Sequence, residues 1–273
     1  MAYDMIVDSA KLNGAMKATA DAVREKTGDN ELINWSMDEG FKGSVEKVFE
    51  AGKQAGEGAM WDSLTDFGNR IDFQYGFMYW GADYIRPNRK LVPTNNATRC
   101  STFNRAKIKA IEKKYFDFSQ SPKGTSNSQG WYYTFFMCEN LEIIEDIGIN
   151  NAYSFVDTFS DCKKLHTIEC IYPDGNTSFS NNVFKNCKSL VKLTVNGTIG
   201  QNGFNVKDCT KLDKESHISI VNSYSTTANV SVTFSKVAVD KAFETSAGAN
   251  DGSTSAEWLA LVGTRPNVSI LLA

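Results

Sequence analysis

Three side chains near the middle of the chain could form an acid–base site. His166 stands three residues before Glu169, and Glu142 precedes it by 24 residues. An imidazole beside a carboxylate is a pair that moves protons in many enzymes. Nucleophilic catalysis would also need a nucleophile in the same constellation, and this pattern supplies none. Neighbouring strands bring such residues together routinely, so the pattern alone does not predict a catalytic site.

Glu145 and Glu169 are a second candidate pair. Two carboxylates that flank a glycosidic bond carry out its hydrolysis. The two glutamates occupy the same position in neighbouring copies of the repeat described below, so adjacent strands would hold them side by side. The simpler interpretation is a solvated acidic patch. A glycan-active enzyme is therefore the third of our hypotheses, and no catalytic residue is predicted.

The cysteines do not follow a metal-binding pattern. The chain has six of them, but no Cys-x-x-Cys pair and only two histidines, so neither a zinc nor an iron–sulfur site is expected. We predict no metal and no cofactor. Cys138, Cys162, Cys187 and Cys209 instead recur after 24, 25 and 22 residues. A cysteine at a fixed buried position behaves as a small apolar residue, and we expect these thiols to be reduced.

These cysteines belong to a repeat that organises residues 135–212. An aromatic or aliphatic residue, a cysteine, a leucine, and an isoleucine or leucine follow one another at three-residue steps. A period in the twenties predicts a solenoid of stacked coils, because one coil cannot bury its apolar edge alone. The repeat residues, which we expect to form the core, are Phe135, Cys138, Leu141 and Ile144; Phe159, Cys162, Leu165 and Ile168; Phe184, Cys187, Leu190 and Leu193; and Val206, Cys209 and Leu212.

Each repeat unit predicts one turn and one strand. The Phe and Cys positions are one helical turn apart, so we expect them on a short helix or 3₁₀ turn. The following runs, 141–147, 165–171 and 190–195, are expected to be strands that stack about 4.8 Å apart in a parallel ladder. Their outward positions form a mixed, mildly acidic surface suited to a protein or polysaccharide ligand: Ile143, Glu145, Thr167, Glu169, Lys192 and Thr194.

The repeat resembles the BspA-like leucine-rich repeat, which occurs in bacterial surface proteins and in proteins encoded by phages and prophages. The resemblance covers about 97–212, where 97–118 is similar to a degenerate leading unit with Phe103, Ile108 and Ile111 in core positions and Ala106 in place of cysteine. It implies the solenoid architecture and a surface built for binding. An exposed loop is expected over 119–130.

The N-terminal third is similar to the heads of proteins carried in phages and prophages of Gram-positive gut bacteria. The resemblance lies in the runs 22–28, 38–41 and 50–56, and the runs 257–262 and 265–267 are similar to the tails of the same proteins. Helices are expected over 8–26 and from residue 37. In the stretch 51–59, Gly52 and Gly56 either let another helix approach closely or loosen the helix.

The fold class expected is α/β: a short leucine-rich-repeat solenoid with a parallel strand ladder, an N-terminal α-helical segment and an α/β C-terminal cap. The predicted divisions are 1–60 for attachment or oligomerisation, 61–96 as an aromatic cap or binding platform, 97–212 as the solenoid, and 213–273 as the C-terminal cap. In this last cap we expect a helix over 213–223, a strand over 230–234, a helix from Ser235 to 243, a helix from Ser253 or Ser255 to 262, and a strand over 268–272.

Composition limits the possible partners. The chain has 273 residues, 41% hydrophobic and 22% charged, with a formal charge of −3. This lacks the basic footprint of a nucleic-acid-binding protein, and no apolar run of about 18 residues predicts a membrane span. The start lacks the pattern of a secretory signal, so we expect synthesis in a cytoplasm.

The first hypothesis is a non-enzymatic phage virion protein. Its N-terminal helices would bind other virion proteins or a second copy, and its solenoid would recognise a host surface protein or polysaccharide. A bacterial BspA-like surface adhesin is the second hypothesis.

Overall fold

The computed structural model describes residues 77–87, 90–92, 100–119, 130–150, 154–180 and 182–273. All of them belong to one compact unit, Asp66–Ala273. Several predictions lie outside the described residues: the helices over 8–26 and from residue 37, the stretch 51–59 with Gly52 and Gly56, the aromatic run over 61–76, and the loop over 120–129.

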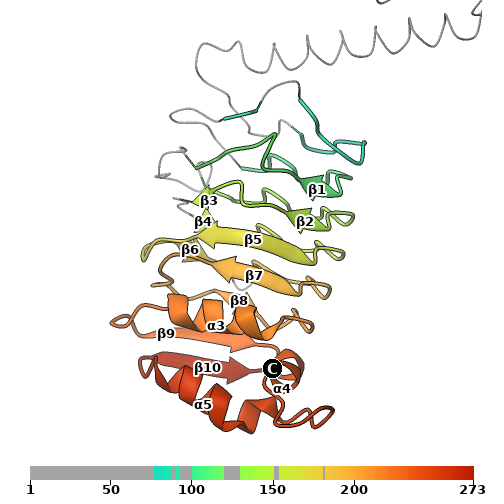
Figure 1. The fold of residues 1–273 in the computed structure, drawn as a ribbon. Coiled ribbons are helices and arrows are strands. Elements are labelled where there is room, and N and C mark those ends of the chain that lie inside the picture. The colour runs from blue at the N-terminus through green and yellow to red at the C-terminus, as the bar shows by residue number, and fades with distance from the viewer. Residues whose placement is uncertain (1–76, 88–89, 93–99, 120–129, 151–153, 181) are drawn as a thin grey trace, which may run out of the picture. The chain divides into compact units, whose positions relative to one another are not determined.

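The described chain is mixed α/β, with parallel sheets and few helices. The main sheet takes one strand from each of four successive units, in the order β1 (Ala110–Ile111), β2 (Ile143–Ile144), β5 (Thr167–Tyr172) and β7 (Lys192–Val195), with β3 (Ile149–Asn150) also paired to β5. Figure 1 shows these strands one below another in chain order. The predicted parallel ladder is confirmed for these strands, although β2 and β7 are shorter than expected.

The register of the ladder places the repeat residues in one buried row. Ile111 pairs with Ile144, Ile144 with Ile168, and Ile168 with Leu193. All four side chains are fully buried, as are the leucines and cysteines that precede them in the three later units and Ala106 and Ile108 in the first. The positions that we expected in the core from the three-residue spacing are buried.

Phenylalanine rings form a second row inside the molecule. Phe77, Phe103, Phe135, Phe159 and Phe184 stack face to face, with centroids 5.4, 5.2, 5.6 and 5.2 Å apart and ring planes within 8° of parallel. Each ring is buried, so each contributes both apolar area and ring stacking. Because Phe77 joins the row, the described part of the predicted aromatic cap packs directly on the first repeat unit. Tyr79 and Tyr84 of the same segment remain exposed.

The segment around each phenylalanine is not the short helix or 3₁₀ turn that we predicted. It is a series of turns in which the residue two positions after the phenylalanine is left-handed, with φ between 57° and 63° at Tyr79, Arg105, Met137, Asp161 and Asn186. This conformation lets alternate N–H groups point along the stack. Phe103 donates to Thr134 and Phe135 to Thr158, at 2.8 and 2.9 Å. A helix would direct those N–H groups to its own carbonyls, so the stack requires the turns.

A helix closes the open edge of the main sheet. In α3 (Lys214–Ser223), three serines face the last strand, β7. Their hydroxyl groups make the hydrogen bonds that the backbone of a further strand would otherwise make. Ser216 accepts the N–H of Leu193 at 2.8 Å, and Ser219 accepts the N–H of Val195 at 2.9 Å. Ser223 donates to the carbonyl of Val195. The sheet edge is thus paired without offering a template to another chain.

The remaining elements follow the predicted order. Asp213 caps α3, Ser235 caps α4, and Ser255 rather than Ser253 caps α5. Val206 of the last repeat unit pairs with Phe234, so the final sheet continues on the phenylalanine side of that unit. The other elements are β4 (Ser154–Phe155), which pairs with β6 (Ser178–Phe179), and β8 (Asn205–Val206), β9 (Val230–Phe234), α4 (Lys236–Ala242), the 3₁₀ helix η3 (Gly252–Thr254), α5 (Ala256–Gly263) and β10 (Val268–Leu272).

His217 on α3 lies at the centre of the C-terminal core. Its ring is fully buried and contacts Phe234, Phe243 and Trp258. Nδ1 donates to the carbonyl of Asp213 at 2.7 Å, while Nε2 is buried without a hydrogen-bond partner. Burial lowers the pKa of His217, and the bond to Asp213 offsets only part of this. The folded protein therefore holds this imidazole neutral.

The phenylalanine row should contribute strongly to stability. Phe159 is stacked on both sides, so Phe159→Ala removes two ring contacts and leaves a cavity, and we expect it to lower the free energy of unfolding by about 3–5 kcal/mol. Val191, which is 39% exposed, offers a control: Val191→Ala should change stability by no more than about 0.5 kcal/mol. Urea denaturation followed by circular dichroism measures both. Similar losses in the two variants would contradict a dominant contribution of the stack.

The free energy of unfolding should also decrease as the pH is lowered, because of His217. The unfolded chain binds a proton near pH 6.5, whereas the folded chain resists it, so the stabilising effect is complete above that pH and is lost as the pH falls. We expect a slope of up to about 1.4 kcal/mol per pH unit below about pH 6.5.

Substitutions of the two histidines separate this effect from others. His217→Phe should flatten the slope whatever its effect on absolute stability, whereas His166→Gln, at an exposed position, should retain it. Denaturation midpoints measured at several pH values test this expectation, and an unchanged slope in His217→Phe would exclude His217 as its source.

Candidate functional site

The predicted ligand-binding surface lies on the outer side of the main sheet. Ile143 pairs with Thr167, and Thr167 with Lys192, so these residues form one row across three strands. Lys192 is exposed and the other outward residues are half-buried. The structure therefore brings the predicted residues together as a surface, and none of them lines either of the two pockets described below.

The two glutamates of this surface are engaged with the backbone. Glu145 accepts the N–H of Lys113 at 2.6 Å, and Glu169 accepts the N–H of Asp146 at 2.8 Å, each from the preceding unit. Both carboxylates thus act as side-chain links between units. His166 contacts Thr167 through Nδ1, and within the described contacts it has no side-chain bond to Glu142 or Glu169. In the described contacts neither candidate pair shares a hydrogen bond, and each glutamate of the second pair accepts a backbone N–H instead.

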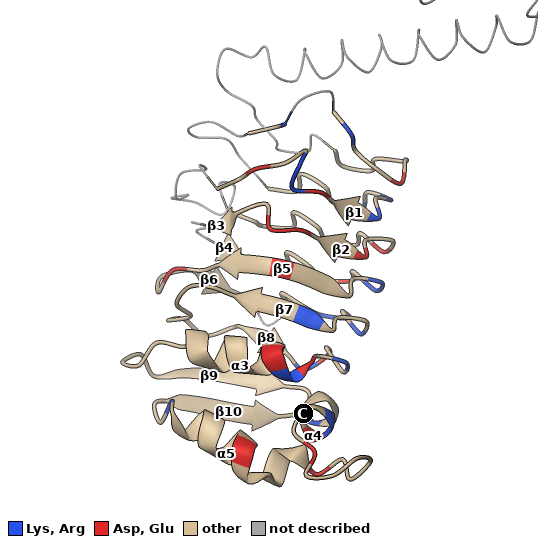
Figure 2. Ribbon diagram, viewed as in Figure 1, with Lys and Arg blue, Asp and Glu red and all other residues tan. Residues whose placement is uncertain are grey.

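Charged residues gather at the turns that precede the strands of the main sheet (Figure 2). Some form pairs from one unit to the next, such as Lys109 with Asp83 at 2.5 Å and Lys163 with Glu139 at 2.7 Å. All four side chains are between 41% and 58% exposed, and exposed pairs of this kind contribute at most about 1 kcal/mol each. These charges are a solvated edge and not a site.

The repeat cysteines have a structural use that the sequence did not indicate. The thiols of Cys138, Cys162 and Cys187 donate to the carbonyls of Phe103, Phe135 and Phe159, respectively, one unit earlier, at 2.8, 3.0 and 3.0 Å. A cysteine thus fills a small apolar space and links two units at once. Burial raises the pKa of Cys138 to about 12 and those of Cys162 and Cys209 well above the ordinary value. All six cysteines are free and buried, including the four repeat cysteines that we expected to be reduced.

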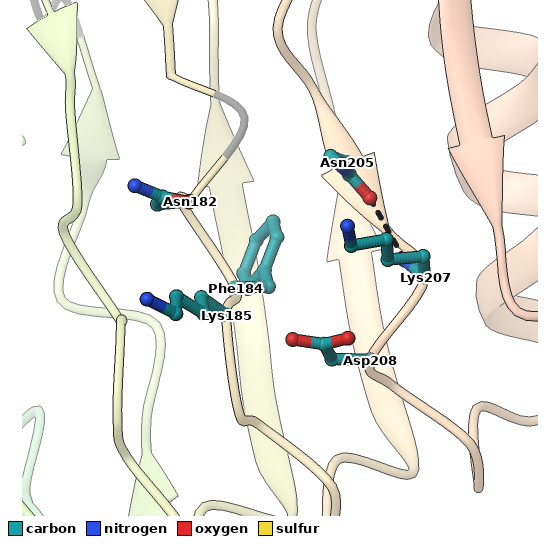
Figure 3. Close-up of a pocket in the computed structure, with 6 residues that line it drawn as sticks. All are labelled: Asn182, Phe184, Lys185, Asn205, Lys207 and Asp208. Atoms are coloured by element: carbon teal, nitrogen blue, oxygen red, sulfur yellow. Dashed lines mark hydrogen bonds between the residues drawn. The ribbon is translucent and has the colours of Figure 1, made fainter.

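A small cavity of about 150 Å³ lies after the third regular repeat unit, where a side-chain carboxylate replaces a backbone carbonyl as the acceptor of a hydrogen bond between units. Asp208 points its carboxylate toward the neighbouring unit (Figure 3) and accepts the N–H of Asn186 at 2.9 Å. At the preceding unit, the equivalent N–H of Asp161 reaches a backbone carbonyl, that of Lys185. We assign this cavity no ligand. Its lining residues are Asn182, Phe184, Lys185, Asn205, Lys207 and Asp208.

A larger site, which we call the polar groove, opens beside the ladder. It has a volume of about 480 Å³ and takes side chains from three successive units. Tyr172, at the end of β5, donates from its hydroxyl to Asp146 at 2.8 Å. The groove is lined by Lys113, Asp117, Ser119, Asp146, Gly148, Asn150 and Tyr172.

A bulge in the sheet creates this groove. Ile144 pairs with Ile168 and Ile149 with Ile171, so residues 145–148 of one unit face only residues 169–170 of the next. The extra length carries Asp146 and Gly148 out of the regular ladder. Gly148 has φ +70°, and a side chain there would lie 2.5 Å from the backbone nitrogen of Ser119. The bulge therefore requires glycine at this position, and bulges commonly re-aim side chains beside binding sites.

The ionisable groups of the groove are held in definite states. Burial raises the pKa of Tyr172, and its hydrogen bonds with Cys170 and Asp146 raise it further, so the hydroxyl keeps its proton at neutral pH. Burial acts to raise the pKa of Asp117, but hydrogen bonds from Ser119 and the neighbouring Lys90 outweigh it and lower the pKa. The groove thus presents a protonated phenol at Tyr172 and an ionised carboxylate at Asp117.

Sequence reasoning did not find the groove. Its residues come from units that differ in length, so they share no spacing with the repeat. The one available signal was Gly148, a glycine directly after the run 141–147 that was expected to be a strand, since a glycine beside a strand often marks a bulge or a bend.

The buried thiols should be unreactive in the folded protein. Because all six are buried and the repeat thiols have raised pKa values, we expect a thiol reagent such as Ellman's reagent to modify the native chain only as fast as the chain opens. In denaturant, six thiols should react at once. Rapid modification of one or more thiols without denaturant would contradict the closed row of cysteines.

Comparisons with known proteins give this chain no relative. No family model matches it, and neither a curated protein nor a solved structure does so significantly. Within the described residues, no helix is both long and apolar enough to cross a bilayer. The same residues contain no group of three or more His, Cys, Asp and Glu side chains that could hold a metal ion.

Proposed function

We propose that this chain is a short BspA-like leucine-rich-repeat solenoid, carried on a phage particle, that recognises a host surface by binding and not by catalysis. The observation that carries the proposal is the continuous row of stacked phenylalanines from Phe77 to Phe184. Five parallel buried rings, with backbone hydrogen bonds between the same units, make a stiff body with a fixed outer surface.

A stiff body suits display. A particle that carries several copies binds a surface far more tightly than one copy does, because each later contact forms at a high effective concentration. Rigidity adds to this effect, since little conformational freedom is lost when each copy binds. The attachment segment in this proposal is 1–60, on the resemblance of the N-terminal runs to phage-borne proteins.

The engaged glutamates favour binding over glycan hydrolysis. Glu145 and Glu169 each hold a backbone N–H of another unit, so their replacement would disturb the contact between units before it affected any substrate. A retaining or inverting glycosidase needs its two carboxyl groups free to face one glycosidic bond. The adhesin hypothesis shares the binding surface and differs only in where the protein is located.

Location therefore tests the proposal. We expect antibodies against this chain to label phage particles induced from the strain that carries the gene, at regular positions seen by electron microscopy. Particles from a strain with the gene deleted are the control. Removal of residues 1–60 should release the protein from the particle while the remainder of the chain stays folded.

Two outcomes would overturn this assignment. Antigen found only in the cell envelope would favour the adhesin, and antigen found only in the soluble part of the lysate would exclude both locations. Fractionation of the same lysate, with particles, envelope and soluble protein probed side by side, distinguishes the three results.

A further inference from the structure

We infer that the polar groove binds a neutral saccharide about two sugar residues long, which would be the host ligand of the displayed protein. Only the origin of the saccharide, on the host surface, rests on the proposed function. The binding itself follows from the charge, the aromatic ring and the dimensions of the groove.

Each carboxylate of the groove is paired with a lysine. The Nζ of Lys113 lies 3.9 Å from a carboxylate oxygen of Asp146, and the Nζ of Lys90, which is not a lining residue, lies 3.2 Å from Asp117. The lining itself has one ammonium group and two carboxylates, so it has no positive charge to attract a phosphate or a polyanion. Paired charges remain strong donors and acceptors, however, and sugar hydroxyls both donate and accept. A polar but uncharged ligand fits this arrangement best.

Tyr172 provides the apolar part of the site. Its ring is half-buried in the wall of the groove, and its hydroxyl is fixed by the bond to Asp146. An aromatic ring with a positioned hydroxyl offers a flat apolar face and a polar tip together. Sugars present the complementary pair of features, since C–H groups cover one face of the ring and hydroxyls surround it.

The dimensions suit two sugar residues. The lining residues come from three adjacent units, and strands in such a ladder lie about 4.8 Å apart, so the groove extends about 10 Å along the stack. A volume of about 480 Å³ lies within the usual range for small-ligand clefts. The bulge at 145–148 keeps the groove open, because Asp146 and Gly148 leave the plane of the sheet there.

Saccharide titration of the full chain tests the inference. The probes are cellobiose, maltose, lactose and N,N′-diacetylchitobiose, with binding followed by saturation-transfer NMR and calorimetry. We expect at least one of them to bind at millimolar concentration or below. Tyr172→Phe removes a hydroxyl and Lys113→Met removes a donor, and each should weaken binding about tenfold.

Matched controls separate binding from folding. Lys113 is 60% exposed on its side chain, so Lys113→Met should melt at the temperature of the parent chain. Tyr133 is also half-buried but lies outside the groove, and Tyr133→Phe should leave the affinity unchanged. Loss of binding in Lys113→Met with an unchanged melting temperature would assign the effect to the groove.

The inference fails if no neutral saccharide binds, or if binding is unaffected in both groove variants. It also fails if calcium ions, inorganic phosphate or sialyllactose bind in the groove while the four neutral probes do not. The virion labelling described above is independent of these titrations. Labelled particles without saccharide binding would refute the groove alone, and saccharide binding without labelled particles would refute the virion assignment alone.

Discussion

The hydrogen bond from one unit's peptide N–H to the next unit's carbonyl is the constraint on which the structure depends. Phe77 donates to Thr102, Phe103 to Thr134, Phe135 to Thr158 and Phe159 to Val183, at 2.8 to 3.0 Å, so the bonds join peptide groups in one continuous series. Bonds in such a series polarise one another. To make them, each unit adopts a left-handed residue that costs roughly 1 kcal/mol or more. The stacked rings and the ladder together offset that cost.

This constraint also explains which features the sequence could predict. The three-residue steps identified Phe, Cys, Leu and Ile as buried, because burial repeats once per unit and leaves a visible period. They did not distinguish a helix from the turns observed, since both place residues i and i+3 on one side. The residues that take the left-handed conformation, Tyr79, Arg105, Met137, Asp161 and Asn186, share no side-chain type. Their conformation comes from the neighbouring unit, and local propensity does not encode it.

At the C-terminal end of the stack, the order of helices and strands could be predicted from the sequence, but the contacts that cover the sheet edge could not. The cap at Ser235 was predicted, and the cap at Ser255 was one of two serines considered, because a cap is a local interaction between a side chain and the next turn. The use of Ser216, Ser219 and Ser223 to pair the edge of β7 was not predicted, because these bonds join residues that are 23, 24 and 28 positions apart. A serine hydroxyl both donates and accepts, so one helix face satisfies the N–H and C=O groups of a strand. The ladder thus ends without an exposed edge.

A ladder that is regular everywhere offers a ligand only a flat surface, so a concave site requires a local departure from regularity. The bulge at 145–148 is such a departure, and the structure retains it through specific contacts. Gly148 is the only residue type that fits against Ser119, and Glu169 holds the N–H of Asp146. Without that bond the bulge would leave an unpaired backbone donor at the sheet. The glutamate that looked like half of a catalytic pair therefore supports the wall of the groove, and its place in the repeat follows from the shape it maintains.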